Sequence, residues 1–175
     1  MNNKMFSEIT FIEELKHEFY RRVVEEGIHR ILICLSLLSQ DQVWQQPNHN
    51  LNSIGNLILH LEGNVKQWFL SSFSLNPDTR IRSSEFDPSR RESISNLTSR
   101  LHSLAAEIQT LLKSLSEDDL LKKYNVQCYS ESGISIIIHV IEHFSYHVGQ
   151  ISFYTKLLVD QDLGYYADEP LDQTN

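Results

Sequence analysis

The sequence predicts an all-α protein, a four-helix bundle. Apolar residues recur at intervals of three and four over four long segments, and each such stripe needs partner helices to bury it. Six Gly and four Pro among 175 residues are too few for a β-protein rich in tight turns. With 41% apolar and 22% charged residues, a chain of this length can bury one sizeable core.

The first predicted helix covers about residues 7–39 and the second covers about residues 54–72. Pro47 and three asparagines interrupt the pattern between them, and Ser53 is a suitable N-cap for the second helix. The stripe of the first helix is Ile12, Leu15, Phe19, Val23, Val24, Ile28, Ile31, Leu35 and Leu38. The stripe of the second is Ile54, Leu57, Ile58, Leu61, Val65, Trp68 and Phe69.

Residues 73–90 show no periodicity and predict a long loop that joins two helices. The third helix is expected over about residues 91–113, and the fourth from Ser132 or Gly133 to about Val159. Between these two helices, the stretch KYNVQCY alternates in a way that predicts a short extended piece. The stripe of the third helix is Ile94, Leu97, Leu101, Leu104, Ile108 and either Leu111 or Leu112.

Charge and chain organisation predict one domain over residues 1–160 and an acidic, solvated tail over residues 161–175. No basic residue follows Lys156. The formal charge of −8 repels phosphate backbones and anionic membrane surfaces, so neither nucleic acid nor membrane is an expected partner.

The two cysteines, Cys34 and Cys128, have no metal or redox spacing, which favours reduced thiols in a cytoplasmic protein. Charges run through the first 19 residues, and no run of 18 apolar residues occurs anywhere. Secretion and membrane spanning are therefore not expected.

The stretch HVIEHFSYHVGQ carries histidines at positions 139, 143 and 147. Residues four apart lie on nearly the same face of a helix, so His143 and His147 can aim at one point, and imidazole is a common ligand of late transition metals. Two ligands are too few for a tight site. The third could come from His60, His102, His17, His29 or His139, and a merely hydrogen-bonded histidine pair is the alternative to a metal site.

The helical wheel puts these histidines beside the core. His60 lies roughly 120° from the centre of its apolar stripe, and His143 and His147 lie roughly 70° to 110° from theirs. A ligand set built from two such flanks would occupy a cleft at the side of the bundle. Three neutral imidazoles would leave a metal its full charge and an open position for a water or a thiol.

The stretches SIGNLILHLEGNVKQW (53–68) and HVIEHFSYHVGQISFYTKL (139–157) together resemble the DinB-like, YfiT-type superfamily of helical bundles. The resemblance covers nearly the whole chain and implies a divalent metal held by His60, His143 and His147. It leaves His139 as a neighbour of the site or a substrate-facing residue. Gly149 is expected to let a neighbouring helix approach closely, and Gln150 and Asn64 are candidate supports of the ligands.

Members of this superfamily include transferases that join bacillithiol or mycothiol to electrophiles, a thiol-dependent isomerase, and proteins classed as metal hydrolases. The resemblance therefore favours a transferase that conjugates a low-molecular-weight thiol to a small electrophile. Zn or Ni is the favoured metal, and Mn, Fe or Co would also suit three histidines. Candidate proton carriers are Tyr154, near the histidine face, and Glu142 and Glu62, which point away from it on the helical wheel.

Two other functions stay open. A hydrolase would use a metal-activated water, although no carboxylate is clearly placed as its base. A non-catalytic bundle would serve in stress or in partner binding. In that case Leu59 and Leu70, opposite the main stripe of the second helix, could mark the surface of a homodimer.

Overall fold

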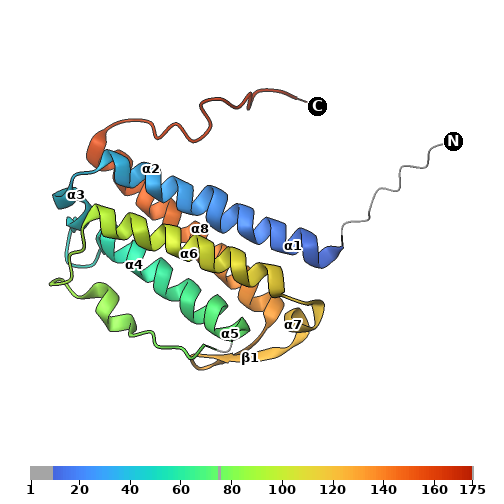
Figure 1. The fold of residues 1–175 in the computed structure, drawn as a ribbon. Coiled ribbons are helices and arrows are strands. Elements are labelled where there is room, and N and C mark those ends of the chain that lie inside the picture. The colour runs from blue at the N-terminus through green and yellow to red at the C-terminus, as the bar shows by residue number, and fades with distance from the viewer. Residues whose placement is uncertain (1–9, 75, 175) are drawn as a thin grey trace.

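The computed structural model describes residues 10–74 and 76–174 and confirms the all-α class (Figure 1). Four long helical segments account for most of it: α1–η1–α2, α4–η2–α5, α6 and α8. Short helices and one hairpin fill the connections. The bounds are α1 Phe11–Tyr20, η1 Arg21–Ile28, α2 His29–Leu37, α3 Gln40–Trp44, α4 Ile54–Val65, η2 Lys66–Leu70, α5 Ser71–Phe73, η3 Arg82–Phe86, α6 Ile94–Ser114, α7 Glu117–Leu121, β1 Lys123–Val126, β2 Tyr129–Ser132 and α8 Gly133–Val159.

These bounds agree closely with the predicted helices. The first long segment contains a π-helical stretch, η1, and the second contains another, η2, yet both continue the helix without a break. Ser53 caps α4 as predicted, because its Oγ accepts a hydrogen bond of 3.1 Å from the backbone N–H of Asn56. The predicted start of the first helix before residue 10 lies outside the described residues.

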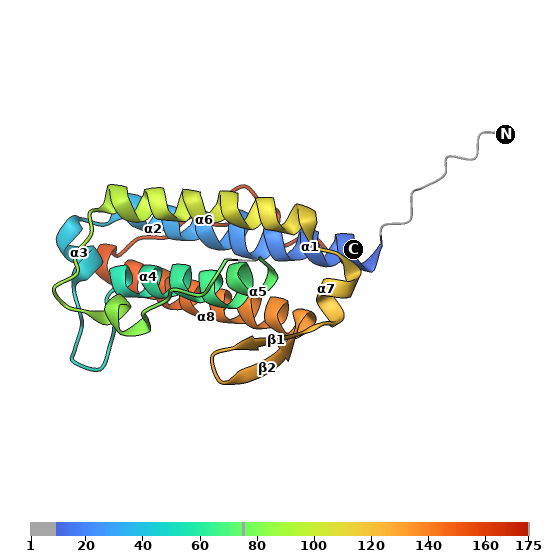
Figure 2. The same ribbon diagram turned by 60° about the horizontal axis from the view of Figure 1, so that its bottom comes forward.

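The bundle has two pairs of parallel neighbours. The α4 and α6 helices run side by side in one direction, whereas α1–α2 and α8 run in the other (Figures 1 and 2). The chain leaving α5 must therefore return along the length of the bundle before α6 can begin. Residues 76–93 belong to this crossover, and its 3-10 turn η3 packs against α4.

The connection between α6 and α8 contains the predicted extended piece. It forms β1, which pairs with β2 in an antiparallel hairpin with Lys123 opposite Ser132 and Val126 opposite Tyr129. Gln127 takes a positive φ of 54° in the turn. The hairpin projects from the end of the bundle beside the start of α8 (Figure 2).

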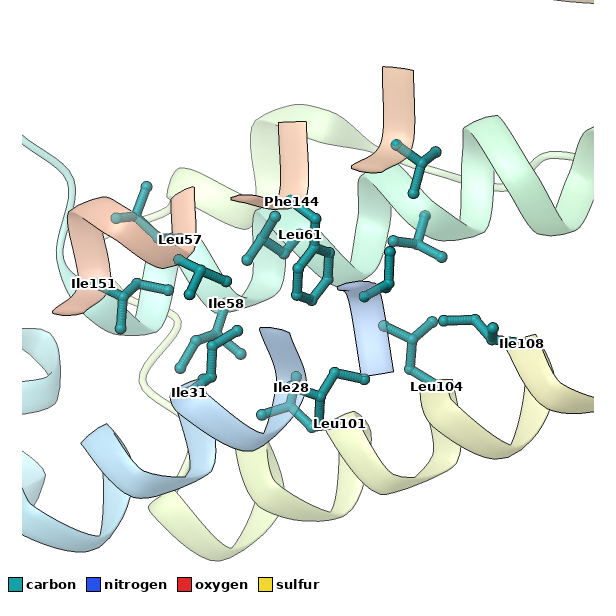
Figure 3. Packing of buried hydrophobic residues seen from close by; sticks show 14 of the residues in the cluster. Ile28, Ile31, Leu57, Ile58, Leu61, Leu101, Leu104, Ile108, Phe144 and Ile151 are labelled. Carbon is teal, nitrogen blue, oxygen red and sulfur yellow. The ribbon is translucent and has the colours of Figure 1, made fainter. Parts of the chain in front are cut away.

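Side chains from all four long segments meet in one core, which Figure 3 shows from close by. Phe144 of α8 lies near its middle, and the predicted stripe residues of every helix contribute, although Ile12, Leu15, Val24 and Ile94 are only partly buried. The labelled residues are Ile28, Ile31, Leu57, Ile58, Leu61, Leu101, Leu104, Ile108, Phe144 and Ile151.

Two surface expectations need correction. Leu59 was expected on an outer face, but it faces the crossover and is only 3% exposed, while Leu70 is half-buried. Part of the segment after residue 160 also packs on the bundle. Leu163 is buried, and the hydroxyl of Tyr165 lies 2.7 Å from Oγ of Ser152. Among the described residues no helix is long and apolar enough to cross a membrane.

A matched pair of leucine substitutions tests this core. Leu104→Ala removes a fully buried side chain of α6 and should lower the free energy of unfolding by about 2–5 kcal/mol. Leu121→Ala makes the same chemical change at a site that is 67% exposed and should cost less than about 0.5 kcal/mol. Urea denaturation measures both, and equal losses would contradict the described packing.

Candidate metal centre

Three histidines converge where α4 packs against α8. His60 comes from the middle of α4, and His143 and His147 come from successive turns of α8. One ring nitrogen from each lies within 4.8 Å of the other two, and Nε2 of His60 is 3.2 Å from Nε2 of His143. The structure thus brings together the three histidines that the sequence motifs singled out.

This spacing fits a divalent cation. Nitrogens bound tetrahedrally at the usual Zn–N distance are about 3.3 Å apart, so the closest pair already has the right separation and the widest pair must draw in by about 1.5 Å. His143 also has a buried Nδ1 with no hydrogen-bond partner among the described residues. Three imidazole nitrogens that converge at this spacing are a donor set that a late transition metal can use.

The far nitrogens of two rings are fixed by hydrogen bonds. Nδ1 of His147 lies 2.7 Å from Oε1 of Gln150, and Nδ1 of His60 lies 2.9 Å from Oε2 of Glu85. Both of these oxygens can accept the Nδ1 proton, and in that tautomer each Nε2 keeps a free lone pair, while Nη2 of Arg80 lies 3.1 Å from Nδ1 of His60 on its way to the same carboxylate. The predicted supporting role of Gln150 therefore has a direct contact behind it.

Burial keeps the α8 histidines neutral. Desolvation, with help from the neighbouring imidazoles, lowers the pKa of His143 to about 3. Burial also lowers the pKa of His147, although the hydrogen bond to Gln150 opposes the shift. Near pH 7 these rings therefore hold no extra proton that a metal would have to displace.

Glu85, the partner of His60, is itself held by an ion pair with Arg80. Nε and Nη2 of Arg80 lie 2.6 and 2.9 Å from the two carboxylate oxygens of Glu85, and both side chains are nearly inaccessible to solvent. Burial alone would raise the pKa of Glu85, but the hydrogen bonds from His60 and Arg80 outweigh it, and the pKa is lowered. Glu85 is therefore a fixed anion that orients His60.

Glu85 can reach His60 because the crossover lies very close to α4. The amide nitrogen of Asn56 donates a 2.8 Å hydrogen bond to the carbonyl of Glu85. One turn after His60, a Cβ on Gly63 would lie only 2.2 Å from Oε1 of Glu85. A residue without a side chain at position 63 is thus what lets the carboxylate reach His60.

A polar hollow of about 450 Å³ lies beside His60 and His143. His139 stacks on Trp68 at its wall with ring centroids 3.8 Å apart, and Nδ2 of Asn64 lies 3.5 Å from Nε2 of His139. Crossover and hairpin complete the lining. The residues concerned are Asn64, Trp68, Arg80, Arg82, Gln127, Tyr129, Glu131, Ser135 and His139, together with the two metal-site histidines.

The three predicted proton carriers are not among the residues that line this hollow. The hydroxyl of Tyr154 donates a 3.3 Å hydrogen bond to the carbonyl of Gln45. Glu62 is buried in ion pairs with Arg100 and Lys66 on another face of α4. Glu142 is exposed and borders a different hollow between α8 and η1.

The structure also adds residues and corrects one expectation. Arg80 and Glu85 lie in the predicted loop 73–90, where only the presence of charged residues in an aperiodic stretch could have pointed to them. Gly149 was expected to admit a neighbouring helix, but no atom lies within 4 Å of a Cβ built on it. The other candidate third ligands, His17, His29, His102 and His139, lie outside the cluster of three.

A double-mutant cycle tests the contact between Gly63 and Glu85. Gly63→Ala should lower the free energy of unfolding by about 1–3 kcal/mol, because the new methyl group displaces a buried carboxylate. In a Glu85→Ala background the same change should cost much less, or even stabilise the helix. Urea denaturation of the four proteins gives the coupling, and additive effects would contradict the contact.

Comparison with known proteins places the chain in a family. A search of curated proteins finds no match. A family model described as "Protein of unknown function (DUF1572)" matches residues 10–166, which includes all four long helices, the crossover and the three clustered histidines. The chain therefore belongs to the family DUF1572.

Proposed function

We propose that the protein is a divalent-metal-dependent enzyme that conjugates a low-molecular-weight thiol to a small electrophile. His60, His143 and His147 are the metal ligands in this proposal, and Zn or Ni is the favoured ion, with Mn, Fe or Co also suited. The observation that carries it is the convergence of three imidazoles beside a polar hollow. The choice of a thiol as the nucleophile rests on the motif resemblance to the DinB-like superfamily.

The charge balance of the site supports this chemistry. A bound divalent ion would supply the positive charge that favours the deprotonated form of a small thiol or a water near neutral pH. The three neutral imidazoles do not offset that charge, and the charges of Glu85 and Arg80 cancel one another. An anionic nucleophile is therefore what this arrangement would stabilise best.

The chain's own residues would position the reactants. The Trp68–His139 stack gives the hollow a flat apolar wall, which suits the body of a small electrophile. The guanidinium of Arg82, which lies over the ring of Phe86, is available for a carboxylate on either reactant. The carboxylate of Glu85, itself held by Arg80, would keep His60 in the tautomer that presents Nε2.

Hydrolysis is the second candidate, because Glu131 of β2 lines the same hollow. A carboxylate there could accept a proton from an attacking water, whereas Glu85 is already occupied by His60 and Arg80. A Glu131→Gln variant separates the two activities, since a hydrolase would lose its base and a thiol transferase would not.

Metal analysis of protein purified without an affinity tag tests whether the protein binds the divalent metal that the proposal requires. We expect about one divalent ion per chain in the wild type and loss of that ion in His143→Ala. His102→Ala, which removes an exposed histidine of α6, should retain it. Metal-loaded wild type should then conjugate at least one of several small thiols to a reactive electrophile. A wild type without metal, or full metal content in His143→Ala, would refute it.

A matched pair of glutamate substitutions tests the support of His60. Glu85→Gln should weaken divalent-metal affinity by about 10- to 100-fold, because the buried anion that orients His60 is lost. Glu62→Gln changes an equally buried, equally paired carboxylate on α4 that does not contact the cluster, so affinity should be unchanged. Competition with a chromophoric chelator measures both, and equal affinities would count against the role of Glu85.

A further inference from the structure

The outer face of α8 carries a stripe of exposed apolar side chains. Phe153 and Tyr146 are 72% and 62% exposed, and Ile138 and Leu157 are also largely exposed. At about 100° per residue, these four positions fall within an arc of about 100°. They extend over about 28 Å of the helix, which is long enough for a helix–helix contact.

Gly149 lies within this arc, near the middle of the stripe. A glycine inside a helix costs about 1 kcal/mol relative to alanine, so a packing reason for it is expected. Within the described part of the chain there is none, because a Cβ at this position would meet nothing within 4 Å. A missing side chain on an outward face is useful when a second helix packs there from outside.

We propose that this face joins two copies of the chain, with their α8 helices packed antiparallel about a two-fold axis near Gly149. In such a pair a residue n positions before the centre faces a residue n positions after it. Glu142 and Lys156 are each seven residues from Gly149, so Glu142 of one copy faces Lys156 of the other, twice. Tyr146, three residues before the centre, faces position 152, and its ring therefore lies next to that of Phe153, which is one residue further along the second copy.

The charges of Glu142 and Lys156 favour a second copy of the chain as the partner of this face, and they favour an antiparallel arrangement of the two α8 helices. A parallel pair would set Glu142 against Glu142 and Lys156 against Lys156. Glu142 makes no ion pair with any described residue, and Lys156 makes only a loose contact with the exposed Asp162, at 3.7 Å. Both charges are therefore free to pair across an interface, and the apolar stripe between them would be covered.

The proposed interface borders the metal centre and leaves its hollow open. The ring of Tyr146 packs edge-on against His147 with centroids 4.9 Å apart, so the second copy would lie next to this ligand. None of the four stripe residues lines the hollow beside His60 and His143. Association and metal binding can consequently be measured separately.

Charge reversal tests the pairing. In sedimentation equilibrium at micromolar concentrations we expect a dimer whose dissociation constant rises about tenfold or more in Glu142→Lys and in Lys156→Glu, because two opposed pairs become repulsive. The double variant should restore the wild-type value. Glu107→Lys, an exposed charge reversal on α6, should change nothing.

Gly149→Leu provides a second, independent test. The new side chain faces open space in one copy, so the thermal melting midpoint of the monomer should not fall, whereas the dimer should be lost. A wild type that stays monomeric at all concentrations would overturn the proposal. So would a dimer that survives Gly149→Leu, or single charge reversals that the double variant does not rescue.

Discussion

The buried carboxylate of Glu85 is the constraint on which the site depends. Burying an anion costs several kcal/mol unless it is paired and hydrogen-bonded, and this one is satisfied only where Arg80 and His60 both reach it. The crossover is thereby fixed against α4 at one point. Removal of any of the three partners would leave the others with an unpaired polar group that solvent hardly reaches.

The direction of the helices explains why such an anchor is needed. Because α4 and α6 are parallel neighbours, the chain between them must return along the bundle, and an aperiodic segment of that length has no backbone pattern to hold it in place. Contacts with α4 hold the crossover in place instead. The amide of Asn56 holds the carbonyl of Glu85, and the bare backbone at Gly63 leaves room for its carboxylate.

Periodicity explains what the sequence could predict. A helix turns by a fixed angle per residue, so the stripes located the four long segments, and the same angle placed His60, His143 and His147 beside the core. The motif resemblance then selected these three histidines as one set. The crossover is not periodic, so no comparable rule predicts where its side chains point. Glu85 lies 25 residues from His60 in sequence, and in an aperiodic stretch it is indistinguishable from a solvated acid. Leu59 was misplaced for the same reason, because the wheel of α4 could not show what covers its outer face.

The last helix, α8, has three faces in different environments, and its sequence places a different kind of residue on each. One face, with Phe144 and Ile151, is buried in the core, and a second presents His143 and His147 to α4. The third, with Gly149 at its centre, packs against no other helix in the described part of the chain. A core face and a ligand face account for the apolar residues and the histidines, but neither accounts for exposed Phe153 and Tyr146 around a bare glycine. An antiparallel copy of the same helix accounts for both, because it needs apolar contact and a close approach at the same place.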